Sequence, residues 1–169
     1  MTKAFNCIVL FFLIQPAIAA TLIMPKDLAD IAEQKGCEQI SNFFERPGQV
    51  DPPYVYGYLP GDAENSAVFW CKKKPGVSTD KPYLLLFASL GSTTPLECPS
   101  QIEWWNPPAG LSIYRAGDLS LEDFHYIENP KISGPKKTLA RGPVVLSSYD
   151  GLEEYFYCYN KKWLYKMLD

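Results

Sequence analysis

His125 is the only histidine in the chain and is therefore the first candidate for acid–base chemistry. Asp123 lies two positions before it, so both side chains would share one face of a strand. A carboxylate that orients an imidazole is part of a hydrolase triad, but no serine occupies a Gly-x-Ser-x-Gly turn that would supply the nucleophile. Two carboxylates could also hydrolyse a glycosidic bond, but aspartate and glutamate are common in any acidic domain, so their presence does not indicate such a site. We therefore expect a non-enzymatic protein, with a small hydrolase that uses His125 and carboxylates as the alternative.

Two adjacent tryptophans followed by an asparagine form the most unusual stretch of the chain, Trp104-Trp105-Asn106. Neighbouring residues of a strand point to opposite faces, so one tryptophan can lie in the core while the other is presented to solvent. A presented tryptophan beside an amide can stack on a sugar ring or anchor a protein contact. The competing interpretation is that both tryptophans are buried. We expect Trp104, Trp105 and Asn106 to form part of a ligand-binding surface.

Lysine pairs follow two aromatic segments that each contain a cysteine. Lys72 and Lys73 come directly after Cys71, and Lys161 and Lys162 follow Cys158 closely. If the two segments are neighbouring strands, these lysines converge into a basic patch that suits an acidic protein or an anionic or glycan component of the cell envelope. The competing interpretation is that lysines at strand ends discourage pairing with other chains.

The cysteine count indicates an oxidising compartment. Of the five cysteines, Cys7 lies in the apolar N-terminal run, which leaves Cys37, Cys71, Cys98 and Cys158. An even number in an exported chain predicts two disulfides. The sequence allows three connectivities, among which we favour Cys37–Cys71 with Cys98–Cys158. No Cys-x-x-Cys pair, phosphate loop or calcium loop is present, so we expect neither a metal site nor a cofactor.

The N-terminal residues have the pattern of an export signal. Lys3 precedes an apolar run over residues 4–14, and the small-residue motif Ala17-Ile18-Ala19 follows it, which predicts a signal peptide over residues 1–19 and a single domain over residues 20–169. The apolar run is too short for a stable membrane span, although a membrane anchor is the alternative. The formal net charge of −3 argues against nucleic acid as a partner. We expect a periplasmic or secreted protein, and the sequence does not fix its oligomeric state.

The remaining pattern predicts one helical region followed by strands. The apolar spacing over 25–45 indicates a helix, interrupted at Gly36. Aromatic and β-branched runs separated by turn residues then recur to the end of the chain, and the last three, over 144–149, 152–159 and 162–168, predict a meander. We expect an α+β fold in which the helical region packs on a bent antiparallel sheet or a small β-barrel with two disulfides.

In size, compartment and strand content the chain resembles the small disulfide-bonded β proteins of bacterial envelopes, among them lysozyme inhibitors. This resemblance assigns no role to any residue. Together with the aromatic and basic segments, it favours a protein that binds a protein or an envelope polymer. A structural component of the envelope is a further alternative.

Overall fold

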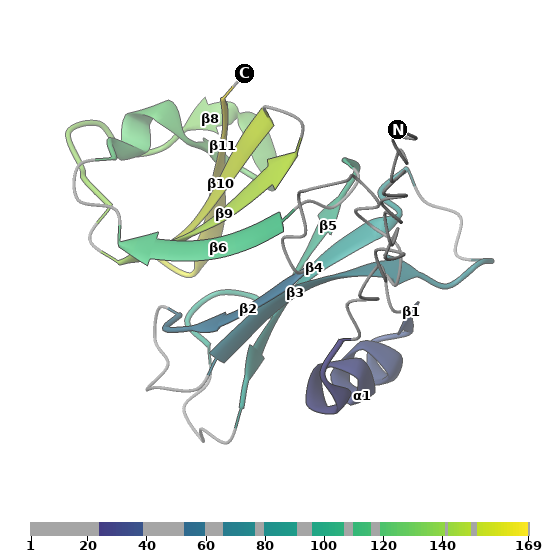
Figure 1. Ribbon diagram of the computed structural model, residues 1–169. Helices are drawn as coiled ribbons and strands as arrows, with labels where there is room; N and C mark the ends of the chain where they lie inside the picture. The colour runs from purple at the N-terminus through teal and green to yellow at the C-terminus, as the bar shows by residue number, and fades with distance from the viewer. Residues whose placement is uncertain are drawn as a thin grey trace, which may run out of the picture.

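The computed structural model describes residues 24–38, 53–59, 66–76, 80–90, 96–106, 110–115, 119–140, 142–149 and 152–168. Its strands form two antiparallel sheets, which are stacked face to face in Figure 1. The expected signal peptide over 1–19 and the second half of the expected helical region lie outside the described residues. Within the described part of the chain, no helix combines the length and hydrophobicity needed to cross a bilayer.

The first sheet is built from the N-terminal half of the chain. It has five strands in the order β1-β3-β4-β5, with β2 also paired to β3. These strands are β1 (Cys37–Glu38), β2 (Tyr54–Gly57), β3 (Ser66–Lys73), β4 (Tyr83–Ser89) and β5 (Gln101–Trp104).

The second sheet is built from the C-terminal half. It has six strands in the order β6-β9-β10-β11-β7-β8. These strands are β6 (Gly110–Arg115), β7 (His125–Tyr126), β8 (Asn129–Ser133), β9 (Pro143–Tyr149), β10 (Leu152–Tyr159) and β11 (Lys162–Leu168). A short 3-10 helix, η1 (Leu121–Asp123), precedes β7. The predicted meander of the last three strands is confirmed, since β10 pairs with both β9 and β11.

The main core lies between the two sheets. Alternate residues of β3 and β4 face it, and so do alternate residues of β10, because successive side chains of a strand point to opposite faces. Trp70 of β3 packs edge-on against Phe156 of β10, with ring centroids 6.3 Å apart. The two sheets also approach each other closely where β2 meets β6. A Cβ atom on Gly57 would lie 2.9 Å from Ile113 Cδ1, so a larger residue here would have to displace the end of the Ile113 side chain.

The outer face of each sheet has a separate apolar cover. Helix α1 (Lys26–Gln34) buries Leu28 and Ala32 against the outer face of the first sheet. On the second sheet, η1 and the segments around it bury Leu121 and Phe124 against Tyr157 and its neighbours. The central strands β3 and β4 of the first sheet are therefore buried on both faces, as their continuous apolar runs require.

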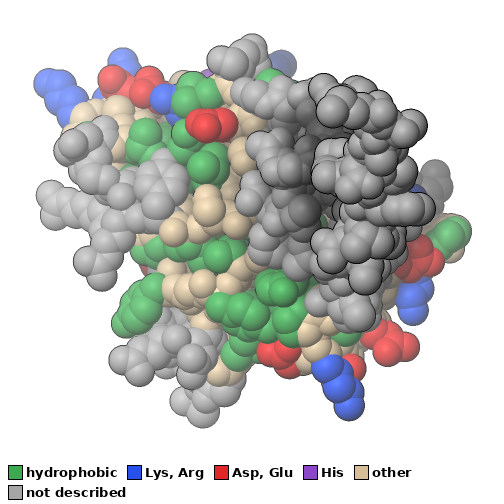
Figure 2. All heavy atoms as spheres, viewed as in Figure 1, with side chains coloured by type: hydrophobic (Ala, Val, Ile, Leu, Met, Phe, Trp, Pro, Cys, Tyr) green, Lys and Arg blue, Asp and Glu red, His purple; other side chains and the backbone are tan. Residues whose placement is uncertain are grey.

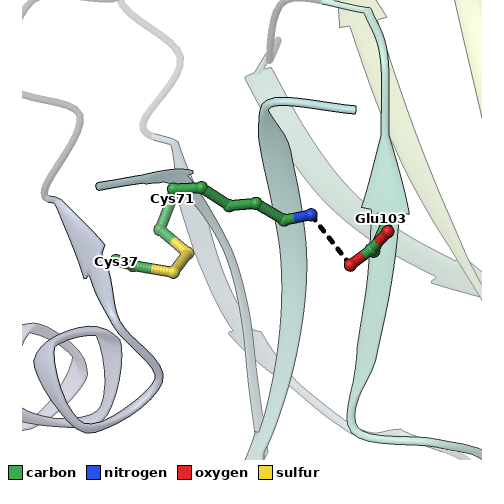
Figure 3. Close-up of a disulfide and its surroundings, with 4 residues drawn as sticks. Cys37, Cys71 and Glu103 are labelled. Carbon is green, nitrogen blue, oxygen red and sulfur yellow. Dashed lines mark hydrogen bonds and ion pairs between the residues drawn. A yellow bond between two sulfur atoms is a disulfide. The ribbon is translucent and has the colours of Figure 1, made fainter. Parts of the chain in front are cut away.

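Both favoured disulfides are present. Cys37–Cys71 joins the segment after α1 to β3. Figure 3 shows this disulfide beside the ion pair between Lys73 and Glu103. Cys98–Cys158 joins the segment before β5 to β10 and so connects the two sheets. The two aromatic segments that contain Cys71 and Cys158 are β3 and β10, one in each sheet.

The expected α+β fold, with a helical region on one bent sheet or small barrel, is wrong. The described part of the chain is mostly β, with one α-helix of nine residues and two separate antiparallel sheets. The helix ends before Gly36, which has a φ of +73° that favours glycine, and Cys37 and Glu38 then form β1, so the helix does not continue directly past Gly36. The physical reason is the amount of apolar strand surface. One short helix covers only part of one sheet face, so the inner faces of both sheets must cover each other.

Candidate functional site

The two adjacent tryptophans lie at the end of β5 and differ sharply in exposure. Trp104 is the last residue of the strand and is 0% exposed, whereas Trp105 follows it and is 39% exposed. Their rings are stacked, with centroids 4.2 Å apart and an interplanar angle of 21°. The division into one buried and one presented tryptophan is confirmed. The stacking was not expected from strand alternation, and it arises because Trp105 lies just beyond the end of the strand.

Trp105 is supported on several sides by other side chains. One face of its indole ring lies on Trp104, and the ring of Tyr165 approaches it edge-on at 6.4 Å. Lys81 Nζ lies over the Trp105 ring, 5.5 Å from its centroid. Because Trp104 occupies one face, the ammonium group takes the other. Tyr165 also packs edge-on against Trp104, with centroids 5.2 Å apart, so the exposed ring rests on a rigid aromatic cluster.

A buried carboxylate lies beneath this cluster. Glu154 of β10 is only 5% exposed, and it accepts hydrogen bonds from the side chains on either side of Trp105 in the sequence. Trp104 Nε1 donates to both carboxylate oxygens at 3.0 Å, and Asn106 Nδ2 donates to Oε1.

Burial governs the electrostatics of this carboxyl group. Desolvation raises the pKa of Glu154 above its ordinary value, and the hydrogen bonds from Asn106 and Trp104 oppose that rise. No lysine or arginine among the described residues forms an ion pair with it. Ser147 of β9 is the register partner of Glu154, and its buried Oγ has no hydrogen-bond partner in the described part of the chain.

Apolar side chains at the end of β11 continue the exposed surface. Met167 is 37% exposed, pairs with Glu154 across the sheet, and lies on the same face of β11 as Tyr165. We call Trp105, Tyr165, Met167 and Lys81 the Trp105 patch. It combines an exposed indole, a half-buried phenol, a thioether and one ammonium group.

The predicted basic patch requires β3 and β10 to be neighbours, and they belong to different sheets. Lys72 pairs with Tyr83 at the beginning of β4. Lys162 precedes Trp163, which stacks on Phe87 near the other end of β4, with centroids 4.1 Å apart. The two lysine pairs therefore lie at opposite ends of the stacked sheets.

Two of these lysines have acidic partners. Lys73 Nζ lies 2.8 Å from Glu103 Oε1 (Figure 3), and Lys162 Nζ lies 3.5 Å from Glu128 Oε2. Lys72 and Lys161 are exposed. On the face in Figure 2, the described lysine and arginine side chains lie mainly at the margins, and hydrophobic side chains occupy the centre. The structure thus leaves the Trp105 patch with Lys81 as its ammonium group, a residue that the sequence patterns did not identify.

The structure separates the residues of the hydrolase alternative. Asp123 belongs to η1, and its carboxylate pairs with Lys166 Nζ at 3.3 Å. His125 lies on β7, where its ring is 6.2 Å from that of Tyr165 and its buried Nδ1 has no partner among the described residues. No described hydrogen bond joins Asp123 to His125, so this carboxylate does not orient the imidazole. Across the described ranges, no cluster of histidine, cysteine and acidic side chains could hold a metal ion.

Sequence reasoning missed Glu154, although a signal for it was present. Glu154, Phe156 and Cys158 are spaced two apart on one strand, so they share a face, and the disulfide marks that face as core. A carboxylate in phase with core residues indicates a buried polar site. The comparison with known proteins adds no assignment, because no protein family, curated protein or solved structure matches this chain.

Proposed function

We propose that this chain is an exported, non-enzymatic binding protein that recognises another protein through the Trp105 patch. The observation that carries the proposal is the arrangement of the two tryptophans. Trp105 is held in contact with solvent by a fully buried Trp104, whose indole N–H is bound to the Glu154 carboxylate. A rigid, exposed tryptophan loses little conformational entropy on binding and is the residue type most enriched at the energetic centre of interfaces.

The surroundings of Trp105 favour a protein over a glycan as the partner. A sugar ring stacks on an open indole face, but Trp104 covers one face of Trp105 and the Lys81 ammonium group lies over the other. The exposed neighbour Met167 and the half-buried Tyr165 are of types enriched in protein interfaces. Charged residues around an aromatic centre are the usual rim of such an interface.

Export is supported by the two disulfides and by the pattern of residues 1–19. Disulfides persist in oxidising compartments and are rare where thiols are kept reduced. A periplasmic or secreted location therefore forms part of the proposal. Detection of the oxidised chain, without residues 1–19, in a periplasmic or culture-fluid fraction would test it.

The binding proposal is tested with an identified partner. Partners captured from envelope extract or culture fluid by the disulfide-intact protein are purified and then titrated against wild type and Trp105→Ala. We expect Trp105→Ala to weaken binding at least roughly 30-fold, as expected for a central interface tryptophan. Tyr58→Ala is the matched control, because Tyr58 is 58% exposed and lies away from the patch, so its loss should leave the affinity unchanged.

Other outcomes would contradict the proposal. A folded Trp105→Ala protein that binds the purified partner as wild type does would exclude the patch as the contact surface. Binding of a purified envelope polysaccharide, with no protein partner, would identify a glycan-binding protein instead. Turnover of an envelope polymer that is lost in His125→Ala would support the hydrolase alternative, and the absence of any ligand would favour a structural envelope component.

A further inference from the structure

The Glu154 carboxylate holds both neighbours of Trp105 in the sequence. Trp104 donates from its indole nitrogen to both oxygens at 3.0 Å, and Asn106 donates from its amide to one of them. Trp104 is the last residue of β5 that pairs with β4, through Tyr83. Beyond that pair, the Asn106 hydrogen bond is the described contact that fixes the chain on the far side of Trp105. The Glu154 carboxyl group of the second sheet therefore binds the side chains on both sides of Trp105, which directly follows the last strand of the first sheet.

The side chains that face Glu154 from the surrounding strands are uncharged. They come from the end of β5, from β9 and from β11, and they are Trp104, Asn106, Ser147, Tyr165 and Met167. Charged groups on the neighbouring segments have other partners. Lys81 lies against the Trp105 ring, Glu103 pairs with Lys73 on the outer face of the first sheet, and the carboxylate of Glu153, on the other face of β10, accepts from Tyr155. The two donors are therefore the main stabilisation of the buried negative charge.

Protonation would change both hydrogen bonds. A carboxylate accepts charge-assisted hydrogen bonds, which are about twice as strong as neutral ones. A protonated carboxyl group has one oxygen that must donate, and Ser147 Oγ offers a buried acceptor without a partner on the adjacent strand. Trp104 and Asn106 would then share a single weaker acceptor. Burial favours this change, because it raises the pKa of Glu154 above its ordinary value.

We infer that Glu154 is a positioning residue for Trp105, whose carboxylate fixes the exposed ring in place and whose protonation loosens it. The binding consequence rests on the proposed function, since it follows that the partner is held more tightly at neutral than at acidic pH. The positioning itself is a property of the chain alone and can be measured without a partner.

The test is an NMR titration of the disulfide-intact chain between about pH 8 and about pH 4. The indole N–H resonances are assigned with Trp104→Phe and Trp105→Phe, and the side-chain carboxyl carbon of Glu154 is followed in the same samples. We expect the Trp104 and Trp105 resonances to shift with one common midpoint, equal to that of the Glu154 carbon and above the ordinary value for glutamate. Glu154→Gln, which keeps the shape and an acceptor oxygen, should abolish both shifts. Glu153→Gln on the opposite face of β10 is the control and should keep them.

Two results would overturn the inference. The first is a Trp104 resonance that titrates with Glu154 while Trp105 does not move, and the second is a pair of indole resonances that titrate unchanged in Glu154→Gln. The proposed function fails separately: the indole shifts can occur as expected while Trp105→Ala leaves partner affinity intact. If both proposals hold, wild-type affinity falls several-fold on acidification and the affinity of Glu154→Gln does not.

Discussion

The two ends of the core between the sheets are closed by different chemistry. At one end, the Cys98–Cys158 disulfide joins the sheets, Trp163 stacks on Phe87, and the indole of Trp163 donates to the Pro99 carbonyl at 2.8 Å. At the other end, the buried carboxylate of Glu154 joins the sheets through Trp104 and Asn106. Both ends use a buried tryptophan whose N–H reaches across the interface, but the acceptor is a neutral carbonyl in one and an ionisable group in the other.

Because of this difference, the disulfide end of the core contributes a constant stability, whereas the contacts at the Glu154 end can change with pH. A covalent bond and a neutral hydrogen bond hold the first end in the same way over the range in which carboxyl groups titrate. The second end contains a carboxyl group whose burial opposes its charge, and the exposed Trp105 lies next to it. The molecule therefore places its candidate binding residue at the end of the core that can respond to pH.

The largest expected effect on stability comes from removing the disulfide that joins the two sheets. Cys98→Ala with Cys158→Ala removes a link across a sequence separation of 60 residues, which should lower the free energy of unfolding by about 4 kcal/mol in the chain-entropy description. The midpoint of guanidinium unfolding measures the loss, and Cys37–Cys71 remains as an internal reference. A loss below roughly 1 kcal/mol would mean that the covalent end contributes little to holding the sheets together.

An intermediate effect should distinguish the two tryptophan hydrogen bonds. Trp104→Phe removes a donor to a buried carboxylate and should cost about 2 kcal/mol at neutral pH, and less once Glu154 is protonated. Trp163→Phe removes a donor to a neutral carbonyl and should cost about 1 kcal/mol at either pH. Unfolding curves at the two pH values measure both variants. Equal pH dependence in the two would contradict the contrast between the ends.

The smallest effect, and the one with a definite sign, is expected for Glu154→Gln. Folding raises the pKa of Glu154, so its protonation stabilises the folded state below the unfolded pKa, and this contribution is lost as pH rises through the folded pKa. The stability of Glu154→Gln relative to wild type should therefore increase from acidic to neutral pH. The gain is about 1.4 kcal/mol for each unit by which folding raises the pKa. Unfolding measured as a function of pH checks the sign, and a relative stability that decreases with pH would contradict it.

Some of this architecture could be predicted because it depends on local patterns. The spacing of aromatic residues placed β9, β10 and β11, and an even cysteine count in an exported chain predicted two disulfides. Strand alternation allowed the sequence neighbours Trp104 and Trp105 to differ in exposure, and they do, so the competing interpretation that both are buried is wrong. The strand and tryptophan predictions use residues that lie close together in the chain, and the disulfide prediction uses only a count of cysteines.

What could not be predicted depends on contacts between distant residues. The number of sheets depends on which strands pair, and apolar runs such as β3 and β4 fit a bent sheet as well as a stacked one. The contact of Glu154 with Trp104 joins residues separated by 50 positions, and Lys81 reaches Trp105 from the segment before β4. The expected basic patch failed for the same reason, because its lysine pairs lie at opposite ends of the core.

The connectivity of the disulfides also bears on how the chain reaches its oxidised state. Cys37 pairs with Cys71 and Cys98 with Cys158, so the bonds follow the order of the cysteines in the sequence and neither loop encloses the other. A chain that enters an oxidising compartment with its N-terminus first presents each of these cysteines in turn. If residues 1–19, which include Cys7, are removed as proposed, joining each unpaired thiol to the next one that emerges then yields the native bonds directly. Maturation of this protein should therefore need a thiol oxidase but no disulfide isomerase.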